Sequence, residues 1–113
     1  MKLFGKKKSG KDWFEEGKDF YKNEQFLDAI ECFDKVILDK KMHKKNTAKA
    51  LSNKGKCMAK LEDYETAIKC LDFAIQLDSK SSDLWFEKSN ILRKMNQDDE
   101  ADKCIEKAKE LDK

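Results

Sequence analysis

The sequence predicts an all-α fold, an α-solenoid of three antiparallel helix hairpins. Three segments align without a gap, so that one repeated pattern fills nearly the whole chain. Each copy has a small residue that is followed twelve residues later by alanine: Gly17 and Ala29, Gly55 and Ala67, Ser89 and Ala101. The copies are 38 residues apart (Gly17 to Gly55) and 34 residues apart (Gly55 to Ser89). Self-similarity at such a period is typical of stacked helical pairs.

The composition agrees with this fold. Of the 113 residues, 42% are charged and 39% are hydrophobic. A stack of amphipathic helices suits that balance, because each helix needs only one apolar stripe. The length predicts a single domain. The net charge of +2 by itself indicates neither a nucleic-acid nor a membrane partner.

The apolar residues are spread along the chain in short runs. None approaches the length of about 18 residues that a transmembrane helix needs, so we expect no membrane span. The first residues, MKLFGKKK, lack the apolar region of a secretory signal. We therefore expect a cytoplasmic protein.

The cysteines are expected to be packing residues. Cys32, Cys70 and Cys104 occupy one repeat position, and a free cysteine behaves as a small buried hydrophobic residue. Thiol chemistry and metal binding are the alternatives. No Cys-x-x-Cys occurs and the only histidine is His43, so we expect no metal site and no cofactor.

Residues 1–10 are predicted to form a basic, flexible N-terminal arm, which contains Lys6, Lys7 and Lys8. The arm is either a solvated tail or a contact for an acidic surface or nucleic acid. A helix follows over about 11–23, with Gly17 in its middle. Glycine there costs about 1 kcal/mol relative to alanine, which indicates that a neighbouring helix approaches closely.

The remaining helices follow from apolar stripes at helical spacing. They are expected at about 26–39, 47–60, 64–77, 82–95 and 99–111, which places the three repeats at about 10–43, 48–81 and 82–113. The linker at 40–46 contains the four extra residues of the longer interval. These residues are expected either to lengthen the preceding helix or to form a longer loop. Ser81 or Ser82 is the expected N-cap of the fifth helix.

The last helix differs from its two counterparts. Isoleucine follows the shared alanine in the first two repeats (Ile30 and Ile68), whereas the third repeat has Asp102. Seven residues later, Ile37 and Ile75 are likewise replaced by Lys109. Terminal repeats need a polar outer face, so we expect the last helix to cap an array of three repeats.

The chain resembles the tetratricopeptide repeat family over about residues 10–113. The spacing of its characteristic positions is matched by Trp13, Gly17, Phe20, Ala29, Phe33 and Val36, then by Leu51, Gly55, Met58, Ala67, Leu71 and Ala74, and finally by Trp85, Ser89, Leu92, Ala101, Ile105 and Ala108. The family usually has proline at the repeat ends, where this chain has Lys41 and Ser79.

The resemblance implies a right-handed superhelix without catalytic activity. In the family, the first helix of each hairpin lines a concave groove that binds a peptide or helix of another protein. Eight of the fifteen corresponding positions here are basic and one is acidic, whereas the second helices are rich in acidic residues. The expected partner-binding residues are Lys18, Tyr21, Lys22, Lys49, Asn53, Lys56, Lys60, Phe86, Asn90, Arg93 and Lys94.

Co-chaperone members of the family clamp the terminal carboxylate of a chaperone with two asparagines and three basic residues. The corresponding positions here are Phe14, Lys18, Asn53, Asp83 and Glu87. Only Asn53 matches, and Asp83 and Glu87 would repel a carboxylate. The sequence therefore argues against that clamp.

The favoured function is a protein-interaction scaffold or adaptor that binds an acidic peptide or helix in a basic groove. Charge segregated in this way attracts an anionic partner, and salt weakens the attraction. A solvated lysine-rich face is the simpler alternative. Binding of nucleic acid by the groove and the arm, or self-association of a monomer into a weak homo-oligomer, are the other hypotheses. No arrangement typical of an enzyme stands out.

Overall fold

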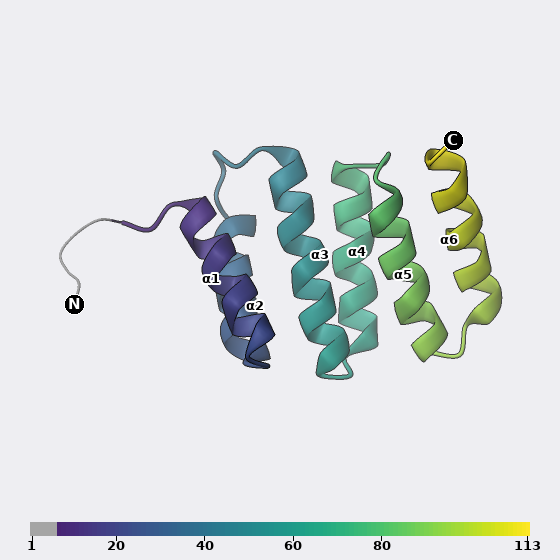
Figure 1. The fold of residues 1–113 in the computed structure, drawn as a ribbon, viewed down its shortest axis with the longest axis horizontal. Coiled ribbons are helices and arrows are strands. Elements are labelled where there is room, and N and C mark those ends of the chain that lie inside the picture. Colours follow the sequence, from purple (N-terminus) through teal and green to yellow (C-terminus); the bar gives the residue numbers. More distant parts are fainter. Residues whose placement is uncertain (1–6) are drawn as a thin grey trace.

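The computed structural model describes residues 7–113, which form six α-helices and no strand. The helices are α1 (Gly10–Lys22), α2 (Phe26–Ile37), α3 (Lys44–Lys60), α4 (Tyr64–Leu77), α5 (Ser82–Lys94) and α6 (Asp98–Leu111). They follow one another in chain order along the long axis of a body that measures 52 × 27 × 18 Å (Figure 1). The predicted fold, an all-α solenoid of three hairpins, is confirmed.

The hairpins stack through contacts between consecutive helices. α1 packs on α2, α3 on α4 and α5 on α6, and α2–α3 and α4–α5 contacts join the hairpins. α3 also touches α1 and α5, so the first helices of the three hairpins form one layer. This layer carries the positions that were expected to bind a partner.

The four extra residues of the first interval lengthen both the linker and the helix that follows it. The linker before α3 spans residues 38–43, whereas the linker before α5 spans 78–81, so the expected longer loop is present. The expected lengthening of the preceding helix is wrong, because α2 has 12 residues and α4 has 14. α3 has 17 residues, whereas α1 and α5 have 13 each. His43 is the N-cap of α3, and its ring Nδ1 accepts a hydrogen bond from the Lys45 amide at 3.1 Å. This cap satisfies one of the amides at the start of the helix, and the helix can therefore begin one turn earlier than the repeat pattern indicates.

The shared small residues lie where the two helices of a hairpin meet. A Cβ atom on Gly17 would lie 2.7 Å from Cε1 of the buried Phe33 ring, and one on Gly55 would lie 3.2 Å from the Ala67 carbonyl oxygen. Ser89 is fully buried, and its hydroxyl donates to the Phe86 carbonyl at 2.7 Å. The close helix approach predicted at Gly17 is therefore present.

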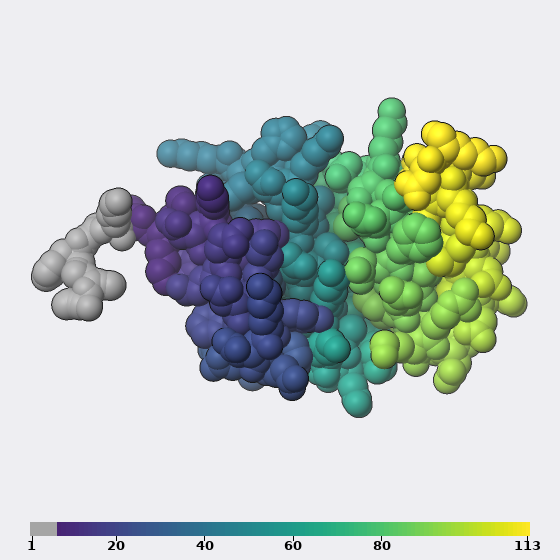
Figure 2. All heavy atoms as spheres, viewed as in Figure 1, coloured from purple at the N-terminus to yellow at the C-terminus, as the bar shows by residue number. Residues whose placement is uncertain are grey.

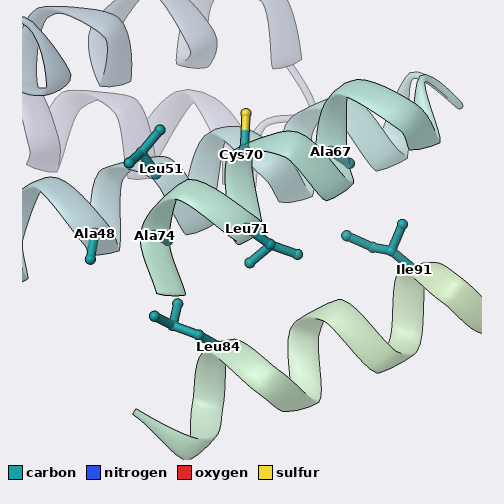
Figure 3. Close-up of a cluster of buried hydrophobic side chains, with 8 residues drawn as sticks. All are labelled: Ala48, Leu51, Ala67, Cys70, Leu71, Ala74, Leu84 and Ile91. Atoms are coloured by element: carbon teal, nitrogen blue, oxygen red, sulfur yellow. The ribbon is translucent and has the colours of Figure 1, made fainter. Parts of the chain in front are cut away.

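The core consists of three clusters, one for each hairpin and its neighbour. Figure 3 shows the central cluster, in which Leu71 of α4 points toward Leu84 and Ile91 of α5. The alanines of the repeat pattern are fully buried: Ala29, Ala67, Ala74, Ala101 and Ala108. The core thus includes most positions of the repeat pattern, together with buried residues outside it such as Ala48, Leu84 and Ile91.

Each hairpin turns through one residue with left-handed backbone: Glu24 (φ 61°), Glu62 (φ 65°) and Asn96 (φ 62°). The next residue's amide donates to the carbonyl five positions before it: Gln25 to Phe20 at 2.9 Å, Asp63 to Met58 at 2.8 Å, and Gln97 to Leu92 at 2.9 Å. This pattern satisfies carbonyls at the helix end, and glycine usually occupies the left-handed position. Here two glutamates and one asparagine occupy it.

The helix starts are capped in different ways. Ser9 and Asp12 form a reciprocal capping box at α1, which begins at Gly10, and residues 1–6 of the predicted arm lie outside the described residues. The Asp63 carboxylate accepts from the Thr66 amide at 3.2 Å in α4. Ser81 is the N-cap of α5, as predicted, although its side chain makes no capping hydrogen bond.

The outer face of α6 is polar. Asp102 and Lys109 are exposed, whereas Ile30 of the first repeat is buried. In the part of the chain that the structure describes, no helix is both long and apolar enough to cross a membrane.

Candidate protein-binding groove

A groove crosses the first helices of the three hairpins, α1, α3 and α5. It consists of two depressions of about 430 Å³ and 330 Å³, which share Lys56 and Glu87. Figure 2 shows this face, where atoms of α3 lie between those of α1 and α5. We call the larger depression the linker half, because it reaches the linker before α5, and the smaller one the lysine half.

The linker half contains two aromatic side chains, Phe14 and Phe86. Phe14 is half-buried and packs edge-on against Phe33, with ring centroids 5.8 Å apart. Phe86 projects from α5 on the other side. The lining residues are Phe14, Lys18, Ala48, Lys49, Ser52, Asn53, Lys56, Asp78, Ser81, Asp83, Leu84, Phe86 and Glu87. The half thus presents apolar surface between charged side chains.

The lysine half lies at the C-terminal turns of α1, α3 and α5. Its lining residues are Tyr21, Lys56, Ala59, Lys60, Glu87, Asn90, Ile91 and Lys94. A shallower depression next to it is formed by Tyr21, Lys22, Glu24, Phe26 and Lys60. Three helices therefore bring their last lysines, Lys22, Lys60 and Lys94, to one end of the groove.

An ion pair marks the boundary between the halves. The Lys56 Nζ atom lies 3.4 Å from Oε2 of Glu87 and joins α3 to α5 across the groove. Both side chains are partly exposed, with exposed fractions of 39% and 30%. The pair is therefore accessible to a bound segment.

Charge is unevenly distributed along the groove. Apart from the boundary pair, the linker half has Lys18 and Lys49 against Asp78 and Asp83. Lys18 also lies 3.4 Å from Glu15 and 5.2 Å from the Phe14 ring centroid. The lysine half has Lys60 and Lys94 with no acidic residue except Glu87. The surplus of positive charge thus lies in the lysine half.

Tyr21 supplies an uncharged hydrogen-bonding group to the lysine half. Burial raises its pKa above the ordinary value of 10, and Cys57 and Glu87 nearby add to the shift. Its ring packs edge-on against Phe26, with centroids 5.4 Å apart, which holds it in place. At neutral pH the phenol is protonated and can donate a hydrogen bond to a carboxylate.

The structure places most of the expected partner-binding residues along the groove. The linker half receives Lys18, Lys49, Asn53 and Phe86, the lysine half receives Tyr21, Lys60, Asn90 and Lys94, and Lys56 lies between them. Lys22 lines the shallower depression. Arg93 is placed differently: its guanidinium lies 2.7 Å from Asp102 and 4.0 Å from Asp98, so it bridges α5 to α6 and does not line either half.

Two residues of the groove were not predicted from the sequence, because they lie in the linker between α4 and α5. Asp78 and Ser81 precede α5, and the resemblance assigned groove positions only within the first helices. The signal that could have found them is their position directly before the first helix of a hairpin. Asp78 matters for recognition, because its negative charge offsets part of the positive charge of the lysines in the linker half.

The five positions that correspond to the chaperone-carboxylate clamp do meet in space. All of them line the linker half: Phe14, Lys18, Asn53, Asp83 and Glu87. Asp83 and Glu87 bring negative charge to this half, which opposes a carboxylate there. The side chains that argue against that clamp thus share one depression.

The four cysteines are buried and free, as the packing interpretation predicts. Burial raises the pKa of Cys57 to about 11, and burial together with Glu16 raises the pKa of Cys32 to about 11. Burial also raises the pKa of Cys70 and Cys104. The thiolate is the reactive form, so these thiols are poor nucleophiles near neutral pH. Among residues 7–113, no group of acidic, histidine or cysteine side chains is arranged to hold a metal ion.

The solved structures that resemble this chain are helical repeat proteins. MamA matches with a TM-score of 0.79 and 21% identity, over 91% of this chain and 58% of the MamA chain. The second TPR of Spaghetti (RPAP3), bound to the HSP90 peptide SRMEEVD, matches with a TM-score of 0.79 and 24% identity over 90% of this chain and 91% of its own. PcrH, in complex with the chaperone-binding region of PopB, matches with a TM-score of 0.82 and 18% identity over 96% of this chain and 86% of its own. At these identities the similarity establishes the fold.

The family is established by sequence. No match is found among curated proteins. Residues 48–81 and 82–113, together more than half of the chain, each match the tetratricopeptide repeat. These ranges contain the second and third hairpins, and the first hairpin has the same architecture. The chain is a member of the tetratricopeptide repeat family.

Proposed function

We propose that this protein is an interaction module that binds an acidic segment of a partner protein in the groove of α1, α3 and α5. The observation that carries the proposal is the convergence of Lys56, Lys60 and Lys94 on one depression, beside the half-buried Tyr21. Family membership supports a scaffold, because tetratricopeptide repeat proteins are generally not enzymes.

The solved relatives support binding of a protein segment on this fold. The Spaghetti structure contains a peptide, and the PcrH structure contains a region of another protein. In this chain, half-buried aromatic rings in the groove offer apolar contact area, and lysines supply charge that selects an acidic partner.

Nucleic acid is less well supported as the partner. The only arginine is Arg93, and its guanidinium is engaged by Asp98 and Asp102 of α6. Arginine and stacked aromatic rings are the usual means of holding phosphates and bases. The acidic residues of the linker half would further repel a phosphate backbone.

A capture experiment with nuclease-treated lysate from the source cells tests the proposal. The wild type is compared with a groove variant that carries Lys18→Glu, Lys56→Glu and Lys60→Glu. The control carries the same charge change on α4 and α6, as Lys69→Glu, Lys103→Glu and Lys109→Glu, because these lysines are exposed and lie outside both halves of the groove.

The expected result is a protein that binds the wild type and the control at low salt, does not bind the groove variant, and is released at high salt. Such a partner should contain an acidic segment whose isolated peptide competes with the whole protein. Retention of the same proteins by the wild type and the groove variant would contradict the proposal.

A further inference from the structure

We infer that the groove has a single acid-binding end, the lysine half, and that the linker half receives an uncharged, apolar part of the same segment. This inference rests on the proposed function and specifies how the segment lies in the groove. It also assigns a role to Glu87, as the group that competes with the partner's carboxylates for Lys56.

The first argument is the local charge. Lys18 and Lys49 line the linker half together with Asp78 and Asp83, whose negative charges offset theirs, so an acidic segment gains little there. In the lysine half, Lys60 and Lys94 are exposed, and the only acidic side chain is Glu87. A carboxylate-rich stretch is therefore attracted to the ends of α3 and α5.

The second argument is the apolar surface. Phe14 and Phe86 both lie in the linker half, together with the buried Leu84 and Ala48. The Phe14 ring is held by its edge contact with Phe33, so it offers a rigid surface that costs little entropy to use. A bulky apolar side chain of the partner fits this half better than an acidic one.

The third argument concerns the boundary. Lys56 reaches both halves, and its ammonium group lies 3.4 Å from the Glu87 carboxylate. A carboxylate of the bound segment can replace Glu87 as the partner of Lys56 or must lie beside Glu87 and be repelled by it. In either case Glu87 lowers the affinity for acidic segments.

A structural role of the lysines is the alternative to be excluded. Lys22, Lys60 and Lys94 lie in the last turns of their helices, where cations complement the helix dipole. If that were their only role, neutral substitutions would lower thermal stability and would leave peptide binding unchanged. The test must therefore measure both quantities.

The test uses a labelled octaglutamate peptide as the probe and the whole chain, isotopically labelled for NMR, as the receptor. At low salt we expect amide shift changes at residues of the lysine half, such as Tyr21, Lys60 and Lys94. We expect smaller changes around Ser81 and Asp83. Equal changes in the two halves, or none in either, would overturn the inference.

Charge-neutralising variants locate the site independently. Lys60→Gln with Lys94→Gln should weaken octaglutamate binding about fivefold, because each exposed lysine–carboxylate contact contributes about a twofold change in affinity. Lys18→Gln with Lys49→Gln removes the same charge from the linker half and should weaken binding less. The variant Lys69→Gln with Lys103→Gln, on α4 and α6, should bind as the wild type does. An equal loss from the two groove variants would contradict the inference.

Glu87→Gln tests the competitor role. It should raise the affinity for octaglutamate about threefold, whereas Asp83→Asn, which makes the same charge change in the linker half, should raise it less. An unchanged affinity in Glu87→Gln would contradict the role of Glu87 as a competitor for Lys56. If the capture experiment succeeds while the two halves behave alike, only this inference fails. If the capture experiment fails, the proposed function fails with it.

Discussion

Gly17, Gly55 and Ser89 occupy the same repeat position, where the two helices of a hairpin approach closely. Gly17 leaves room for the Phe33 ring, and Gly55 leaves room for the Ala67 carbonyl. Ser89 fits because its hydroxyl donates to the Phe86 carbonyl. A glycine in the middle of a helix is unfavourable by itself, so its presence here reflects helix packing.

Gly17→Ala should destabilise the protein, although alanine is the better helix former by about 1 kcal/mol. The added methyl group would lie 2.7 Å from the buried Phe33 ring, and overpacking of this kind costs about 1–3 kcal/mol. Urea denaturation gives the free energy of unfolding, and Lys103→Ala at an exposed helical position is the control. A variant at least as stable as the wild type would show that the ring has room to move.

Glu62→Gly should stabilise the protein by about 1 kcal/mol, because a residue other than glycine pays roughly that amount for left-handed backbone. Glu106→Gly, in the middle of α6, is the matched control and should destabilise by about 1 kcal/mol. Thermal or urea unfolding measures both. A loss of stability in Glu62→Gly would mean that the glutamate side chain makes a contribution larger than the backbone cost.

The buried cysteines should make the folded state sensitive to alkaline pH. The pKa of Cys57 is raised from 9.0 in the unfolded chain to about 11 in the folded state. The folded state therefore holds the proton more tightly between those values, and the free energy of unfolding falls as pH rises through them. Cys57→Ala should reduce the slope of stability against pH in this range. An unchanged slope would contradict the assigned shift.

At the scale of the helices, the sequence predicted existence and order better than boundaries. The apolar stripes and the buried alanines located all six helices, because those residues repeat in one register. The start of α3 was predicted three residues too late. The cap that starts the helix earlier comes from His43, whose side chain accepts from the Lys45 amide, and the repeat pattern does not include that position.

The repeat also places equivalent ion pairs between neighbouring hairpins. Lys54 of α3 pairs with Asp34 of α2, and Lys88 of α5 pairs with Asp72 of α4, each at 2.7 Å. The two pairs occupy equivalent positions of the repeat. At the lysine position, α1 instead has Glu16, which pairs with Lys8 at 2.6 Å. At the aspartate position, α6 has the exposed Glu106.

At the scale of the whole molecule, this arrangement opposes head-to-tail stacking of two copies. Stacking through the same contacts that join the hairpins would place Glu16 of one molecule near Glu106 of the other. We therefore predict a molecular mass that does not change with concentration in analytical ultracentrifugation. Glu16→Lys should promote association, and Glu65→Lys on α4 is the control. A wild-type mass that rises with concentration would contradict this prediction.

The groove could be predicted in part. The family resemblance placed Lys56, Lys60 and Lys94 on one surface, because the repeat register fixes which residues of a first helix face the groove. The resemblance could not predict the net charge of each half of the groove. That charge depends on Asp78, which lies in a linker, and on Arg93, which pairs with Asp102 of α6 instead of lining the groove. These features depend on contacts between elements, and the repeat pattern describes only positions within them.

The measurement that tests the central claim most directly is the affinity of the whole chain for octaglutamate as a function of sodium chloride concentration. Attraction between partly exposed charges is screened by salt. The account predicts that wild-type affinity falls steadily as salt rises, and that Lys60→Gln with Lys94→Gln binds weakly with a shallower dependence. An affinity that is independent of salt, or a salt dependence that survives unchanged in this variant, would contradict recognition by the lysine half.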